Sequence, residues 1–183
     1  MSSNKVKFGL SSCYYSKITV SSGTETFATP VSLPGAVNLS LDPSGDTSNF
    51  YADNGIYYAL TANQGYSGSL ELALIPDDFK KDILGESVNT TTGVYVETSN
   101  ATLSEFALLF QFEGDTHATR HLMYRCVATR PSVASQTTAE STEPVTETLN
   151  LTCMPLISNN RVKARCEEGD TAYSGWFGAV YTS

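Results

Sequence analysis

Alternation of apolar side chains with smaller or more polar ones is the main pattern along this chain. In EFALLFQFEG, the large apolar residues Phe106, Leu108, Phe110 and Phe112 occur at every second position. A period of two places successive side chains on opposite faces of a β-strand. The positions between them include Ala107 and Leu109, so we predict a strand with one fully buried face and one partly buried face.

The same period recurs elsewhere and predicts many short strands. YSGSLELALI places Leu70, Leu72 and Leu74 on one face. Gly114 and Asp115 mark a turn, after which ATRHLMYRCVATRP is predicted to return as a partner strand of a hairpin. Further strands are predicted over residues 8–20, 145–151, 161–166 and 176–181.

One segment follows a helical pattern instead. In PDDFKKDILG, Pro76 suits the first turn, Phe79 and Ile83 share a face, and Gly85 suits the left-handed residue that ends a helix. A short helix from about Pro76 to Leu84 is therefore predicted to flank the strands. This combination predicts a mainly β fold, an antiparallel β-sandwich or barrel-like sandwich. A length of 183 residues suits one domain over residues 1–183.

Charge and composition restrict the function. The formal net charge is -8 and the pI about 4.6, so an average surface would repel DNA. The start MSSNKVKFGL has no charged segment leading into an apolar one, and apolar runs are shorter than a membrane span. We expect a chain that begins near Met1, is made in the cytoplasm, and does not act at a membrane.

Signatures of catalysis and of metal binding are absent from the sequence. No Gly-x-Ser-x-Gly, Gly-rich phosphate loop or His-Glu-x-x-His motif occurs, so we expect neither an enzyme nor a bound cofactor. The four cysteines are widely spaced and are predicted to be reduced, small apolar side chains on strands. His117 and His121 fall in a predicted turn and strand. Arg120, Arg125 and Arg130 are expected to form a solvated or salt-bridged face.

The stretch SLDPSGDTSNFYADNGIYYAL joins turn residues to aromatic ones. Asp42, Asp46 and Asp53 raise the alternative of a calcium loop, but the stretch lacks the terminal Glu and flanking helices of such a loop. Turn chemistry explains Pro43 and Gly45 better. It does not explain the aromatic residues, which need a surface to bury against, and a partner chain is one candidate.

Several stretches, taken in order, resemble a known family. They are VKFGL, PGAVNLSLDPSGDTSNFYADNGIYY, GYSGSLELALIPDDFKKDILG, EFALLFQFEGDTHATRH, LMYRCVATRP and STEPVTETL. Together they are similar to major tail proteins, the tail tube proteins of long non-contractile-tailed bacteriophages and prophages of Gram-positive bacteria. The resemblance covers nearly the whole chain and is strongest from Pro34 to Pro144.

This resemblance implies a structural virion protein without catalytic activity. Such a protein would form hexameric rings that stack into the phage tail tube, through which DNA passes during ejection without specific binding. The implied partners are further copies of the chain, the tape measure protein, and the tail terminator and baseplate proteins. Edge strands, the N-terminal arm and the C-terminal GWFGAVYTS are candidates for contacts between subunits, although Trp176 is predicted to lie in the core.

The resemblance also implies a long inter-strand loop, residues 42–65, as the main assembly element. The predicted subunit-interface residues are Asp46, Phe50, Tyr51, Asp53, Ile56, Tyr57 and Tyr58. Two alternatives from other classes stay open. One is a carbohydrate- or surface-binding β-sandwich module, which would remain a monomer, and the other is a β-rich enzyme with a dispersed active site.

Overall fold

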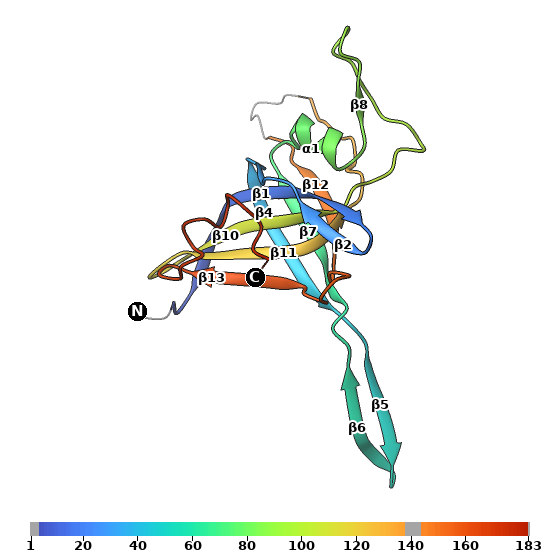
Figure 1. Cartoon of the computed structure of the whole chain (residues 1–183), viewed down its shortest axis with the longest axis vertical. Coiled ribbons are helices and arrows are strands. Elements are labelled where there is room, and N and C mark those ends of the chain that lie inside the picture. Colours follow the sequence, from blue (N-terminus) through green and yellow to red (C-terminus); the bar gives the residue numbers. More distant parts are fainter. Residues whose placement is uncertain (1–3, 138–143, 183) are drawn as a thin grey trace.

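An antiparallel sheet of nine strands dominates the computed structural model, which describes residues 4–137 and 144–182 (Figure 1). Its strands are β1 (Lys7–Ser21), β2 (Thr24–Phe27), β3 (Val31–Ser32), β4 (Ala36–Ser44), β7 (Gly65–Leu72), β10 (Phe106–Gly114), β11 (Thr119–Ala128), β12 (Glu147–Met154) and β13 (Lys163–Glu167). Their order is β2-β1-β10-β11-β12-β7-β4, with β3 on β1 and β13 on β11. The predicted mainly β class is confirmed.

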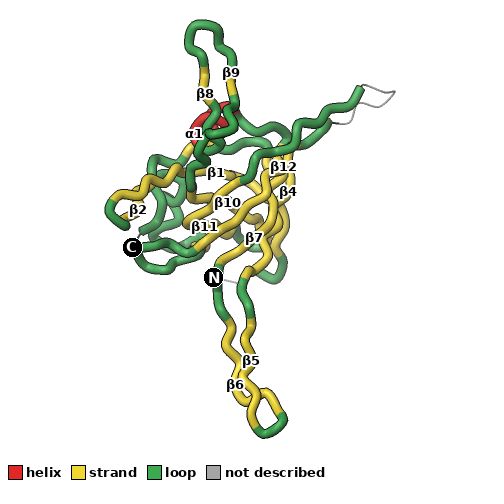
Figure 2. Tube along the Cα trace, turned by 90° about the vertical axis from the view of Figure 1, so that its right-hand side faces the viewer, coloured by secondary structure: helices red, strands yellow, loops and turns green. Residues whose placement is uncertain are grey.

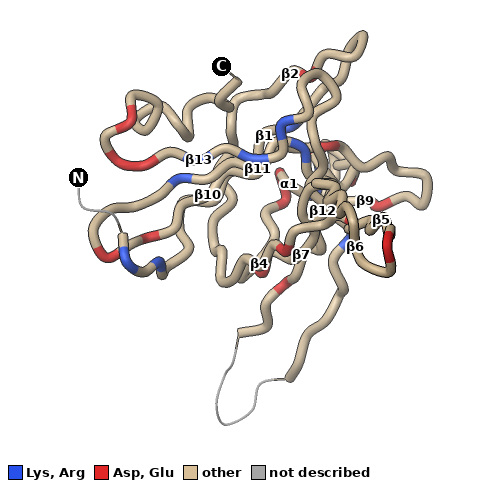
Figure 3. The backbone as a smooth tube through the Cα atoms, turned by 90° about the horizontal axis from the view of Figure 1, so that it is seen from below, with Lys and Arg blue, Asp and Glu red and all other residues tan. Residues whose placement is uncertain are grey.

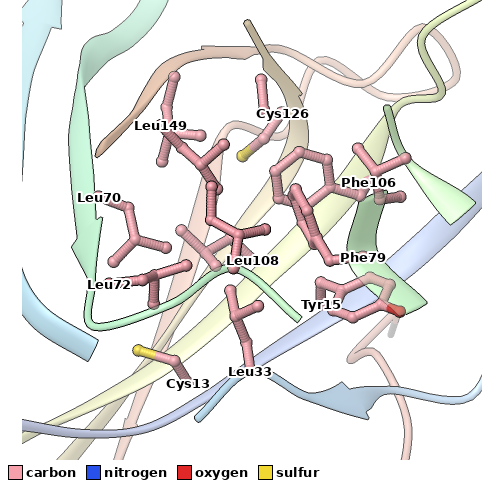
Figure 4. Packing of buried hydrophobic residues seen from close by; sticks show 14 of the residues in the cluster. Cys13, Tyr15, Leu33, Leu70, Leu72, Phe79, Phe106, Leu108, Cys126 and Leu149 are labelled. Carbon is pink, nitrogen blue, oxygen red and sulfur yellow. The ribbon is translucent and has the colours of Figure 1, made fainter. Parts of the chain in front are cut away.

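The main core lies where this sheet folds over itself. Buried residues from β7 and β12, such as Leu70 and Leu149, pack against Leu108 of β10 and Cys13 of β1 (Figure 4). The predicted hairpin of β10 and β11 is confirmed, with Phe112 paired to Thr119 next to the turn.

A second core lies on the other face of β10 and β11, beneath the C-terminal part of the chain. Ala107 and Leu109 are fully buried there, whereas Gln111 on the same face is half-buried, which confirms the predicted partly buried second face. Trp176 covers them and is 3% exposed, as predicted, and its indole N–H donates to the carbonyl of His121 at 3.3 Å. Residues 176–181 form turns and irregular backbone rather than the predicted strand, because they serve as this cover.

The helix α1 (Asp77–Asp82) is confirmed at the predicted place. Pro76 occupies the N-cap position, and Gly85 follows the end of the helix with φ +77°. Phe79 is fully buried and meets Tyr15 and Phe106 edge-on, at ring-centroid distances of 5.0 and 5.3 Å (Figure 4). The helix therefore closes the end of the main core that contains Phe106.

Leu74 does not share the buried face predicted for it and is 66% exposed. Strand β7 ends at Leu72, and the N–H of Ile75 donates to the carboxylate of Glu147 as the chain turns into α1. Leu74 falls in this bend, where strand alternation no longer applies.

The four cysteines are buried, free and on strands, as predicted: Cys13, Cys126, Cys153 and Cys166. The Sγ atoms of Cys126 and Cys153, on paired positions of β11 and β12, lie 3.0 Å apart. Burial raises the pKa of Cys13 to about 12 and also raises the pKa of Cys126. Thiolate chemistry at neutral pH is therefore disfavoured at these positions.

Candidate functional site

The segment between β4 and β7, predicted as a long inter-strand loop over residues 42–65, forms a long β-hairpin. It consists of β5 (Thr47–Ala52) and β6 (Gly55–Thr61), which pair only with each other. At the rise of a strand, the nine residues from Gly45 to Asp53 span about 30 Å. The hairpin projects away from the rest of the molecule in both side views (Figures 1 and 2).

Its tip has the chemistry of a two-residue hairpin turn. Asp53 and Asn54 both have positive φ, 51° and 62°, between the paired residues Ala52 and Gly55. Positive φ at both central positions is typical of a type I′ turn, which matches the twist of the flanking strands. The sequence Asp-Asn-Gly between two aromatic runs was thus the signal for a hairpin. At the base, Gly45 lies so close to the Ala62 carbonyl that a Cβ would clash.

All five predicted apolar anchors lie on this hairpin, and each is more than half exposed: Phe50, Tyr51, Ile56, Tyr57 and Tyr58. Leu60 joins them at 58% exposure and was missed by the sequence analysis, although it follows Tyr58 at strand spacing. Phe50 and Tyr58 are paired across the hairpin and share one face with Leu60, whereas Tyr51 and Ile56 share the other.

The β5–β6 hairpin exposes apolar side chains to water on both of its faces. An isolated two-stranded hairpin is at best marginally stable, and a contiguous exposed apolar patch marks an interaction surface. Neither apolar face packs on the chain's own cores. The hairpin is therefore suited to burial against another molecule.

The predicted polar contacts Asp46 and Asp53 lie at the base and the tip of this hairpin, and both are exposed. Neither carboxylate forms an ion pair with a described residue. No Lys or Arg occurs between Lys17 and Lys80 in the sequence, so the hairpin carries only negative charge. In the described part of the chain, no group of three or more His, Cys, Asp or Glu side chains is placed to hold a metal ion.

A basic groove lies on the body of the molecule, at the end of the main core remote from α1. It consists of two adjoining hollows of about 480 and 350 Å³, both lined by Lys7, Phe112 and His121. The first hollow also borders Lys5 and Arg165, and the second borders Lys163. Figure 3 shows basic segments beside the N-terminus and along the neighbouring strands.

Part of the lining of the basic groove is apolar. Leu39 and Leu41 of β4 line one side, and Phe110 and Phe112 of β10 line another. The ring of His121 stacks on Phe110 with a centroid distance of 5.3 Å. The groove thus combines apolar surface with several cations, in a chain whose net charge is -8.

Two of these cations are held over aromatic rings. The Lys7 ammonium lies 5.4 Å from the centroid of Phe112, and the Lys163 ammonium lies 4.7 Å from that of Tyr66. Lys163 also donates to the Tyr66 hydroxyl. Among the described residues that line the groove, the acid is Glu167, which lies 3.4 Å from His117 and 4.0 Å from Arg165.

We predict that His121 makes the stability of the protein depend on pH. Burial, followed by the charges of Arg165, Lys7 and Lys163, lowers the pKa of His121 from 6.5 to about 4. Between these values the unfolded state binds a proton that the folded state does not, so the free energy of unfolding decreases as the pH falls through this window. After allowance for solvent screening, the contribution is on the order of 1 kcal/mol.

The measurement is urea unfolding at pH 7 and pH 4.5 for the native chain and for His121→Gln. The substitution keeps a polar side chain without a titrating group. We expect a smaller loss of stability for the variant, and an equal loss in the two proteins would contradict the assignment.

The three arginines considered in the sequence, Arg120, Arg125 and Arg130, contact different residues and do not form a common binding site. Arg125 makes two hydrogen bonds to Glu105, at 2.6 and 2.8 Å, and Arg130 pairs with Glu97 at 2.7 Å, which confirms the predicted salt bridges for two of the three arginines. Arg120 instead stacks on Tyr173, with 3.7 Å between its guanidinium carbon and the ring centroid.

A second, shorter hairpin projects from the opposite end of the molecule (Figures 1 and 2). It is formed by β8 (Ser87–Val88) and β9 (Tyr95–Val96). Val94, Tyr95 and Val96 are exposed on it. The chain therefore carries apolar side chains on projections at both ends.

Neither a scan against protein-family models nor a search of curated proteins finds a match for this chain. A helix of the length and apolarity needed to cross a membrane is not found among the residues that the structure describes. The β5–β6 hairpin and the basic groove are therefore the features from which a function can be argued.

Proposed function

We propose that this protein is a structural subunit that assembles with copies of itself, as the major tail protein of a long non-contractile-tailed bacteriophage or prophage. Its rings would stack into the tail tube. The observation that carries the proposal is the β5–β6 hairpin, an arm about 30 Å long that holds exposed aromatic side chains away from the core. The sequence resemblance to tail tube proteins supports the same reading.

A projecting arm favours a particular type of assembly. When an arm of one subunit contacts a different surface on the next, the contact is heterologous, and repeating it generates a ring or a filament. The hairpin carries exposed aromatic residues and only negative charge, which fits such a contact. The outer edge of β4, which pairs with no other strand in the described part of the chain, offers a further place where subunits can meet.

The charge of the chain suits a conduit. A net charge of -8 would keep a passing DNA molecule from binding to the wall by its phosphates. In this proposal DNA contacts the protein only in transit. The tape measure, tail terminator and baseplate proteins are its other partners, and the assembled tail is its location.

Electron microscopy and sedimentation velocity of the purified protein test the proposal. We expect rings or tubes of uniform diameter, with a mass distribution that moves to larger species as the concentration rises. A monomer that persists at all concentrations and salt conditions would contradict assembly. If that monomer were retained on immobilised glycans, the result would favour the alternative of a carbohydrate-binding module over the proposed tail tube protein.

A further inference from the structure

We propose that the basic groove is the surface that receives the β5–β6 hairpin of a second copy of this chain. The inference rests on the proposed function, because it names the receiving surface of the same assembly. One molecule carries both surfaces, the acidic and aromatic β5–β6 hairpin and the cationic basic groove with its apolar lining.

The charges of the two surfaces are complementary. Asp46 and Asp53 are exposed on the hairpin, which carries no cation. Cationic side chains gather at the groove instead: Lys5, Lys7, Lys163 and Arg165. Oppositely charged patches favour the correct encounter and fix its register, whereas two hairpins or two grooves would repel each other.

The groove is also suited to aromatic side chains. Its two hollows, of about 480 and 350 Å³, lie in the range of sites that bury small organic molecules. Leu39, Leu41 and Phe110 supply the apolar part of its lining, and the cations at its rim can lie over tyrosine rings as Lys163 already lies over Tyr66. Aromatic anchors in such a pocket carry most of the energy of many interfaces.

The hairpin cannot easily reach the groove of its own molecule. Leu39 and Leu41, in the groove wall, lie on the strand that leads directly into the hairpin. The aromatic residues lie farther along the β5–β6 hairpin, which extends beyond β4 and away from the sheet (Figure 1). When a second copy places its hairpin in the groove of the first, the groove of the second copy stays free. A third copy can then place its hairpin there, and the assembly continues.

Charge reversal on each surface and on both together tests the inference. Lys163→Glu with Arg165→Glu, and separately Asp46→Lys with Asp53→Lys, should each raise the concentration needed for assembly roughly tenfold or more. An equimolar mixture or a chain with all four substitutions should recover most of the assembly. The matched control is Lys17→Glu with Lys81→Glu, which changes the charge equally at exposed positions outside the groove and should have little effect.

The outcomes separate the two proposals. If the native chain forms no oligomers, the proposed function fails. If it assembles, and the groove variant assembles as well as the control, only the groove assignment fails. Failure of the four-substitution chain to recover, despite a folded circular-dichroism spectrum, would also contradict direct pairing of these charges.

A zero-length carbodiimide cross-link on the unmodified protein gives a second, independent measurement. Assembled mixtures of ¹⁴N- and ¹⁵N-labelled chains should yield mixed-isotope peptides that join Asp46 or Asp53 to Lys5, Lys7 or Lys163. Cross-links from the hairpin to other lysines alone would overturn the assignment. Protection of Lys7 and Lys163 by inorganic phosphate, with no such cross-links, would show an anion site in place of a docking groove.

Discussion

Replacing residues 45–64 with a two-residue Asn-Gly turn is expected to leave a folded monomer that no longer forms rings or tubes. Ser44 and Gly65 are paired in the ladder between β4 and β7, so a type I′ turn can join them directly. The change removes every exposed apolar anchor of the β5–β6 hairpin and both of its acids. Neither core loses a side chain, since no residue of the hairpin belongs to either cluster.

Sedimentation velocity and electron microscopy measure the loss of assembly, and thermal unfolding measures the fold. We expect a melting temperature within about 5 °C of the native value. Asn49→Ser with Thr61→Ser is the control, because it changes two exposed polar residues of the hairpin and should preserve assembly. Tubes of normal length from the shortened chain would mean that the hairpin is not the assembly element.

Phe79→Ala is expected to lower the free energy of unfolding by about 3–5 kcal/mol, because it empties the end of the main core. The Phe79 ring is fully buried and joins α1 to the sheet through Tyr15 and Phe106. A loss of this size is a large share of the stability of a typical domain.

Urea unfolding followed by the fluorescence of Trp176, the one tryptophan, gives the measurement. Phe50→Ala removes the same ring from the exposed hairpin and should cost less than about 0.5 kcal/mol while weakening assembly. Similar losses of unfolding free energy for the two variants would contradict the placement of Phe79 in the core and of Phe50 on the exposed hairpin.

Local patterns predicted the fold well where one face of an element meets the core. The alternation around Phe106 located β10, and the spacing of Phe79 and Ile83 located α1. The same rule failed for Leu74, which lies beyond a strand end, and for residues 176–181. There the apolar residues cover a sheet without joining it, and no strand period distinguishes these two roles.

The candidate site was predicted in part. Its hairpin residues were identified from their aromatic content, but their strands were not, because apolar residues on both faces remove the alternation that reveals a strand. The basic groove was missed altogether. Lys7, Leu39, His121 and Lys163 come from β1, β4, β11 and β13, and only the folding of the whole sheet brings these strands together.

The two hairpins at opposite ends of the molecule give any stack of co-oriented subunits a direction. One end would present the aromatic β5–β6 arm, and the other the shorter β8–β9 arm with Val94, Tyr95 and Val96. Addition at either end would form the same interface, but the two ends would expose opposite halves of it and could therefore grow at different rates. The protein that initiates such a polymer and the protein that terminates it would bind different surfaces. Neither protein could therefore replace the other.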